Sequence, residues 1–263
     1  MGAIKVHGRY YQMTPAERFK GHVDQDFDVD SDRSALLVVD IYGHGFAKDG
    51  SAANHPYSDT ETDKRWDDIT LNHIRPAMLA ARSAGLPVIY AHNSAPNIRM
   101  ERSEFGKQLR RSLQCDISAL NSERKGGIDP REYLVSEGKH VLDIAPAVAP
   151  QPGDYYVRKH LYSGFKDTRL DSLLRNLDIK TVFCAGFDAS VCLLCTVIDA
   201  FELNYEVVLL RDAVCAIEFP EDREIHYSFT DRIVKWIEAV VGRSIDVQEF
   251  IRFVRSIAPR AAT

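Results

Sequence analysis

Five short apolar runs recur along the chain from residue 34 onward. Several of them are apolar on successive residues, which is typical of strands covered on both faces. Stretches with helical periodicity lie between and after the runs. Strands that alternate with helices predict right-handed crossovers and an α/β fold, a three-layer α/β/α sandwich around a mostly parallel, doubly wound sheet. The predicted strands are residues 34–40, 86–92, 154–159, 181–185 and 206–210, and the predicted helices are 66–84, 168–176, 191–203 and 221–241.

Two segments lie outside this alternation. Residues 1–33 are polar and predict an irregular N-terminal arm ahead of a single domain at 34–263. Within the arm, Thr14 and Pro15 are suited to the N-cap and first position of a short helix. Residues 94–140 are too many for a simple connection, so we expect a helical insertion near the functional site.

Composition narrows the function classes. The apolar fraction of 45%, the charged fraction of 27% and the formal net charge of −5 are those of an ordinary globular protein without a nucleic-acid footprint. Basic residues gather between 99 and 111, but Glu101 and Glu104 interrupt them, which is typical of a solvated helical face. No run has the length of a membrane span, and the first residues lack the apolar core of a signal peptide. We therefore expect no nucleic-acid or membrane partner.

The cysteines indicate free thiols. There are five of them, an odd number, and their spacing matches no disulfide framework. This usage predicts a reducing, cytoplasmic location. Cys192 and Cys195 form a C-x-x-C pair, but no second Cys or His pair lies at zinc-finger spacing, so we expect no zinc site.

Three reactive side chains fall at or just past the ends of predicted strands. Asp40 closes the first run, Lys159 closes the third, and Cys192 follows the fourth after a tight turn and begins an apolar helix. Ligands of doubly wound sheets bind at the carboxyl ends of the strands. Taken singly, a capping carboxylate, a surface lysine and a small buried cysteine would explain them. Together they predict a nucleophilic site, with the thiol at a helix N-terminus that favours thiolate.

These residues carry a resemblance to the isochorismatase-like cysteine hydrolases over about residues 34–250. The matching motifs are Leu37-Val-Val-Asp40, Val157-Arg-Lys159 and Gly186-Phe-Asp-Ala-Ser-Val-Cys192. Lys159-His-Leu-Tyr-Ser-Gly-Phe165 and Asn93 are similar to the ureidoacrylate and biuret hydrolase branch. There, the matching Asn and Tyr162 positions belong to the substrate pocket. The chain departs from the family at Asp40-Ile-Tyr-Gly-His-Gly-Phe46, at Asp188 and at Ala189, which puts the substrate in doubt rather than the triad.

The resemblance implies a mechanism. Cys192 is the nucleophile, Asp40 its base and Lys159 the cation that stabilises the thiolate. The backbone amides of Cys192 and Asp188 would form the oxyanion hole, the latter through a cis peptide after Phe187. Neither a metal nor any other cofactor is implied, and homo-oligomers, dimers or tetramers, are expected. The residues expected to contact substrate are Phe46, Asn93, Tyr162, Phe165 and Phe187.

The predicted function is cleavage of the C–N bond of a small ureido or carbamoyl amide, with release of ammonia through a thioester. An amide such as Asn93 offers both a donor and an acceptor to a ureido edge. Alternatives are amidases of maleamate, N-carbamoylsarcosine or nicotinamide, a non-catalytic binding module, and a thiol redox protein using Cys192 and Cys195. Nicotinamidases usually carry an Asp-x-His metal cluster, and Asp49, His44 and His55 lack that spacing.

Overall fold

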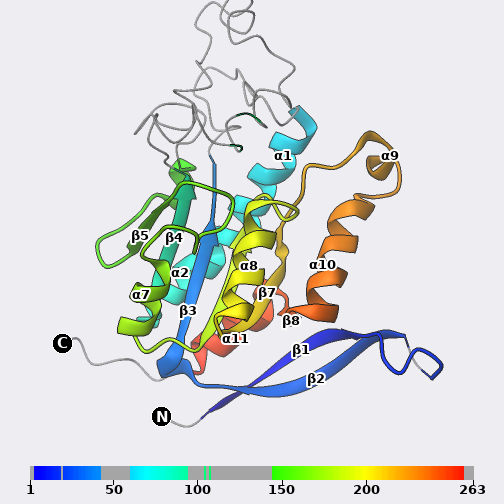
Figure 1. Cartoon of the computed structure of the whole chain (residues 1–263). Helices are drawn as coiled ribbons and strands as arrows, with labels where there is room; N and C mark the ends of the chain where they lie inside the picture. The colour runs from blue at the N-terminus through cyan, green and yellow to red at the C-terminus, as the bar shows by residue number, and fades with distance from the viewer. Residues whose placement is uncertain are drawn as a thin grey trace, which may run out of the picture.

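The computed structural model describes residues 3–18, 20–42, 60–93, 104, 107 and 144–257. Their strands form one eight-stranded sheet in the order β2-β1-β8-β7-β6-β3-β4-β5 (Figure 1). The predicted α/β class and mostly parallel sheet are confirmed. The strands are β1 (Ile4–Gln12), β2 (Gly21–Val29), β3 (Ser34–Val39), β4 (Val88–Asn93), β5 (Tyr155–Lys159), β6 (Thr181–Gly186), β7 (Glu206–Val214) and β8 (Arg243–Ile245).

The strand order sets the place of the functional site. From β3 the chain adds β4 and β5 on one side, and it then returns to add β6, β7 and β8 on the other. All five pairings among these six strands are parallel. The order therefore reverses between β3 and β6, and the crevice outside the carboxyl ends of those two strands is where a doubly wound sheet binds its ligand.

Helices cover both faces of the sheet. One face carries α1 (Thr60–Ile69), α2 (Arg75–Ser83) and α11 (Val247–Arg255), and the other carries α7 (Leu170–Asn176), α8 (Cys192–Glu202) and α10 (Ser228–Val240) (Figure 1). Side chains alternate across β3, so Leu36 and Val38 join the first core and Leu37 and Val39 the second. Every residue of β3 is buried, which explains its continuous apolar run.

The expectation of an irregular arm at residues 1–33 is wrong. β1 and β2 form an antiparallel hairpin, and β1 continues the sheet by pairing antiparallel with β8. Alternate apolar side chains, among them Val6 and Phe27, pack into the core from strands whose other residues are polar. No helix starts at Thr14, because residues 15–18 are the turn that joins the two strands. The domain division at residue 33 stays a prediction.

Two predicted helices differ in detail. The helix expected at 66–84 begins earlier, at Thr60, and includes a π-helical turn, η3 (Thr70–Ile74), just before Pro76, which has no N–H to donate to the preceding turn. The helix expected at 221–241 is broken into α9 (Pro220–Arg223) and α10. The break is stabilised by Glu218, whose carboxylate accepts the backbone N–H groups of Phe229 and Thr230 at the start of α10.

Two further expectations concern the insertion at residues 94–140 and the absence of a membrane span. The insertion predicted at 94–140 lies outside the described residues, apart from the helical Glu104 and Lys107. Of the helices that the structure describes, none combines the length and apolar character of a bilayer-crossing segment.

Candidate active site

Asp40 follows β3 in a strained backbone conformation. Its φ is 46°, in the left-handed region, where a residue with a Cβ is held only by its surroundings. Its N–H donates to the carbonyl of Ala91 on the neighbouring β4 (3.1 Å), and its side chain is fully buried. Strained residues of this kind cluster at functional sites. The turn places a buried carboxylate at the switch point of the sheet.

Gly186 allows the turn that leads to Cys192 to lie close against β3. It ends β6 with a φ of 116°, and a Cβ at this position would lie 2.0 Å from the carbonyl oxygen of Val39 on β3. Only glycine fits there. The next residue, Phe187, donates its N–H to the same carbonyl (2.8 Å). The chain then turns through residues 188–191 into α8, whose first residue is Cys192.

The side chain of Asp188 organises this turn. One carboxylate oxygen accepts from the N–H and the hydroxyl of Ser190 (2.6 and 2.7 Å), and the other accepts from the N–H of Ile217 (2.9 Å), in the loop after β7. The Asp188 carbonyl accepts from the N–H groups of Val191 and Leu193.

The cis peptide expected between Phe187 and Asp188 is wrong. Within the described part of the chain the one cis bond is Thr14–Pro15. The trans turn is compatible with the bonds to the Asp188 carbonyl and carboxylate that close it. The amide of Cys192 lies at the N-terminus of α8, where the first N–H groups of a helix have no intrahelical acceptor and are available to an oxyanion. A role for the Asp188 amide in such a hole stays a prediction.

Lys159 joins the other two groups. At the end of β5, its Nζ lies 2.6 Å from Oδ2 of Asp40 and 3.3 Å from Sγ of Cys192. It also donates to Oδ1 of Asn93 (2.5 Å) and to the carbonyl of Leu161 (3.1 Å). Its side chain is fully buried. The structure therefore brings together Asp40, Lys159 and Cys192, which are far apart in the sequence.

Burial and the neighbouring groups shift the pKa values of Lys159 and Cys192. Burial alone would lower the pKa of Lys159, but the charges of Asp40 and Cys192 outweigh it and raise that pKa above the ordinary value, so the ammonium is retained. Burial raises the pKa of Cys192 well above that of a free thiol; Lys159 opposes this shift and Asp40 adds to it. Burial therefore favours the thiol form of Cys192, against the expectation that the helix N-terminus favours the thiolate.

Asn93 and Tyr42 surround the ion pair. The backbone N–H of Asn93 donates to Oδ1 of Asp40 (3.0 Å), and its Nδ2 donates to Oδ2 of Asp40 (3.3 Å) and to the hydroxyl of Tyr42 (2.5 Å). The imidazole of His92 is also close to the carboxylate, with its Nδ1 3.9 Å from Oδ1 of Asp40. Sequence reasoning singled out neither Tyr42 nor His92. The position of Tyr42, two residues after Asp40, was noted only as a departure from the family pattern.

The loop after Lys159 docks on the nucleophile helix. Ser163 donates its hydroxyl to Asp199 on α8 (2.6 Å), and the N–H of Gly164 donates to the hydroxyl of Thr196 on the same helix (2.9 Å). A Cβ on Gly164 would lie 3.1–3.3 Å from three neighbouring side chains, tighter than nearly all real contacts. The Tyr-Ser-Gly-Phe signature thus holds Lys159 against α8.

The residues expected to contact substrate have different surroundings. Tyr162 is half-buried, and burial together with the neighbouring Cys192 and Cys195 raises the pKa of its hydroxyl. Phe165 is buried with its ring 6.0 Å from that of Tyr205, and Phe187 stacks on Trp66 at 4.6 Å. Both rings are therefore core contacts, and their roles toward substrate stay predictions. Phe46 lies outside the described residues.

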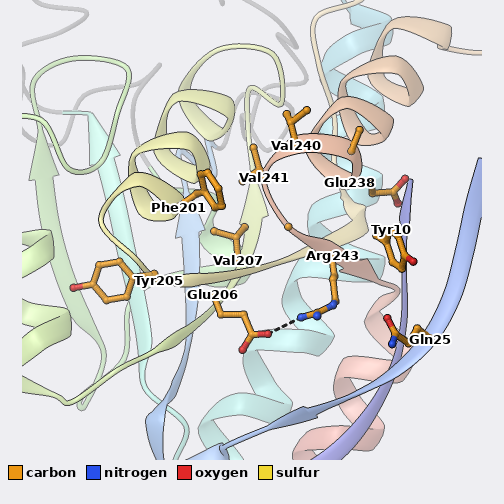
Figure 2. Close-up of a pocket in the computed structure, with 12 residues that line it drawn as sticks. Tyr10, Gln25, Phe201, Tyr205, Glu206, Val207, Glu238, Val240, Val241 and Arg243 are labelled. Atoms are coloured by element: carbon orange, nitrogen blue, oxygen red, sulfur yellow. Dashed lines mark hydrogen bonds and ion pairs between the residues drawn. The ribbon is translucent and has the colours of Figure 1, made fainter. Parts of the chain in front are cut away.

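A cavity of about 470 Å³ lies at the opposite end of the sheet (Figure 2). The amino end of β7, the C-terminal end of α10 and the hairpin line it, and an ion pair between Glu206 and Arg243 (2.7 Å) lies within it. Because the triad residues are at the carboxyl ends of the strands, this cavity is separate from the site.

Among the described residues no three metal-ligating side chains gather. His44, Asp49 and His55 lie outside them, and metal independence stays a prediction.

Comparisons with known proteins show the family and the fold of the chain. The sequence pattern described as the isochorismatase domain matches residues 34–239. The ureidoacrylate amidohydrolase RutB of Pantoea ananatis is 32% identical over 181 residues, which are 69% of this chain and 68% of that protein. The crystal structure of a cysteine hydrolase from Pseudomonas syringae pv. phaseolicola is similar with a TM-score of 0.66 and 23% identity, over 88% of this chain and 96% of that one.

A second structural relative extends the fold comparison. A hydrolase of Chromobacterium violaceum superposes with a TM-score of 0.59 and 17% identity, over 87% of this chain and 97% of that one. At such identities the structural likeness concerns the fold alone. It covers more of the chain than the domain pattern does.

Proposed function

The chain belongs to the isochorismatase family and is a hydrolase of that family, and from this premise we propose that it is a cysteine amidohydrolase of small ureido or carbamoyl compounds. One observation carries the proposal: a buried ammonium 2.6 Å from a carboxylate and 3.3 Å from a thiol, at the switch point of a doubly wound sheet. A nucleophile and a base joined by a third group are the recurring arrangement of covalent catalysis.

The first half of the proposed reaction forms a thioester. Asp40 takes the proton of the Cys192 thiol, and the sulfur attacks the carbonyl carbon of the substrate. Lys159 stabilises the negative sulfur during this transfer. The carbonyl oxygen becomes an oxyanion at the N-terminus of α8, where one lost donor typically costs about 3–4 kcal/mol of transition-state stabilisation. The C–N bond then breaks, and the proton held by Asp40 passes to the leaving nitrogen, which departs as ammonia.

The second half releases the product. Asp40 removes a proton from a water molecule, whose oxygen attacks the thioester carbon. The C–S bond breaks, and the sulfur takes back a proton from Asp40 as the thiol re-forms. The acid product leaves and the site returns to its starting protonation. No redox partner is needed for this cycle.

The ureido substrate class rests on the RutB relative and on the polar groups near the thiol. A ureido group presents a flat edge of N–H donors around a carbonyl acceptor, and the Tyr162 hydroxyl is a suitable partner for that edge. Among the described residues, the Asn93 side chain bonds to Asp40, Tyr42 and Lys159, and these partners take both Nδ2 hydrogens and one lone pair of Oδ1. A site built for polar groups rejects analogues that lack them, since its own groups are then left unpaired.

The test is a panel of biuret, N-carbamoyl compounds, simple aliphatic amides, maleamate and nicotinamide, with ammonia release as the readout. We expect kcat/KM to be at least about tenfold higher for the ureido compounds, a gap of ~1.4 kcal/mol. Tyr162→Phe should reduce this preference. Tyr205→Phe, which also removes a tyrosine hydroxyl but at the far end of α8, should not. Equal rates across the panel, or a strong preference for nicotinamide, would refute the substrate class.

A further inference from the structure

Tyr42 is buried directly beside the ion pair. Its N–H donates to the carbonyl of Asp40 (3.0 Å), and a single β-bridge joins it to Ile144. Its ring meets His92 edge-on at 5.3 Å and lies 6.4 Å from that of Trp66. These contacts hold the ring firmly, so the hydroxyl has a fixed place. That hydroxyl accepts a hydrogen bond from Nδ2 of Asn93.

The side-chain amide of Asn93 lies between the Lys159 ammonium and the Asp40 carboxylate, and its oxygen and its nitrogen face different charges. Its oxygen faces the ammonium of Lys159 (2.5 Å), and its nitrogen faces Oδ2 of Asp40 (3.3 Å). An amide rotated by half a turn would direct N–H groups at the ammonium and its oxygen at the carboxylate. Nδ2 carries two hydrogens, and Tyr42 accepts the one that Asp40 does not. The two charges therefore set the orientation of the amide, and the Tyr42 hydroxyl restrains it in that orientation by accepting the second Nδ2 hydrogen.

We infer that Tyr42 is a positioning residue, which acts through Asn93 to hold the Lys159 ammonium and the Asp40 carboxylate in place around the Cys192 sulfur. The inference rests on the proposed cysteine chemistry but on no particular substrate. It assigns the Asn93 side chain primarily to the triad, through its bonds to Asp40 and Lys159. Tyr42 itself is too enclosed, at 6% exposed, to be a substrate ligand in this arrangement.

The experiment is substrate-free alkylation of Cys192 by iodoacetamide, with its rate followed from about pH 7 to about pH 11, and with mass spectrometry of the peptide as the readout. Tyr42→Phe keeps the ring and removes only the hydroxyl. The control is Tyr90→Phe on β4, which also removes a buried hydroxyl, one that donates to the carbonyl of Val148 (2.6 Å) away from the triad. Loosening Asn93 weakens the hold on the ammonium beside the sulfur. We therefore expect the midpoint of alkylation to move up in pH for Tyr42→Phe and to stay unchanged for Tyr90→Phe.

Turnover supplies a second readout. One neutral hydrogen bond corresponds to about a two- to tenfold change, so kcat should fall by that factor in Tyr42→Phe with KM within about twofold. Adding Tyr42→Phe to Asn93→Ala should cause no further loss. An unchanged alkylation midpoint, or the same extra loss in the Asn93→Ala background, would overturn the inference. A shifted midpoint without ureido hydrolysis would instead count against the proposed substrate alone.

A measurement on the unmodified protein covers the case in which Tyr42→Phe fails to fold. The side-chain NH₂ protons of Asn93, assigned in a ¹⁵N spectrum by their loss in Asn93→Ala, should exchange slowly with solvent because both are bonded inside the protein. Fast exchange of both protons would overturn the inference.

Discussion

The ion pair between Asp40 and Lys159 offers the sharpest test of the site. Both side chains are fully buried, with Nζ 2.6 Å from Oδ2. Removing one partner of a buried pair leaves an uncompensated charge and typically costs about 3–5 kcal/mol. We therefore expect Asp40→Asn and Lys159→Met each to lower the free energy of unfolding by about that amount. The double variant leaves no buried charge, so it should be more stable than the sum of the two losses predicts.

Denaturant unfolding measures this directly, because Trp66 stacks on buried Phe187 and its fluorescence should change on unfolding. The coupling energy of the double-mutant cycle should be at least about 2 kcal/mol in favour of the double variant. The exposed pair of Arg175 and Asp171 is the control, and Arg175→Met should leave the free energy of unfolding close to that of the native protein. Additive losses at Asp40 and Lys159 would refute the reasoning, since they would mean that neither charge depends on the other.

The same pair gives a pH dependence with a definite sign. The pKa of Lys159 is raised in the folded protein, so the folded state holds this proton more tightly than the unfolded chain does. The stabilisation is fully present below the ordinary lysine value of 10.5 and is lost as pH rises through the folded pKa. The unfolding free energy of the native protein should therefore fall in strongly alkaline solution by more than that of Lys159→Met.

Three other predictions concern the nucleophile and metals. Cys192→Ala and Cys192→Ser should be folded but inactive, whereas Cys195→Ala should keep most of its ammonia-releasing activity; the reverse pattern would assign the nucleophile to Cys195. The charge of Asp40 is one of the causes that raise the pKa of Cys192. Asp40→Asn should therefore abolish turnover and shift iodoacetamide labelling of Cys192 to lower pH. A shift of the labelling to higher pH would contradict this account. Activity should survive prolonged dialysis against a chelator, and its loss with recovery on adding a metal would disprove metal independence.

The strands that build the site are readable from the sequence because they are buried on both faces. Residues 34–40 and 181–185 were predicted within one residue of β3 and β6. The hairpin was missed because its strands are mostly polar, with few inward apolar residues to reveal an alternation. α11 had a readable signal that was overlooked. Asp246 caps its N-terminus, and Val247, Phe250 and Val254 recur at helical spacing.

Positions at strand ends could be predicted, but contacts between separate loops could not. The ends of β3, β5 and β6 brought Asp40, Lys159 and the Cys192 turn to one edge, as the topology requires. The bond from Asn93 to the Tyr42 hydroxyl depends on side-chain distances that no spacing encodes. The same is true of the bond from Ser163 to Asp199. The cis peptide was carried over from the family, and it does not occur in this turn.

The hairpin of β1 and β2 makes contacts that a form of this protein without its first residues would lose. Glu238 on α10, with its side chain fully buried, accepts from Arg9 on β1 (2.8 Å) and lies 2.9 Å from His22 on β2. On α11, Glu249 accepts the backbone N–H of His7 (2.9 Å). Consider a chain shortened only at its N-terminus, so that it begins at residue 34, where the matched domain pattern begins. It would keep both carboxylates without these partners and expose the edge of β8 to other chains. The segment matched by the domain pattern and the sheet that the chain forms therefore differ in extent.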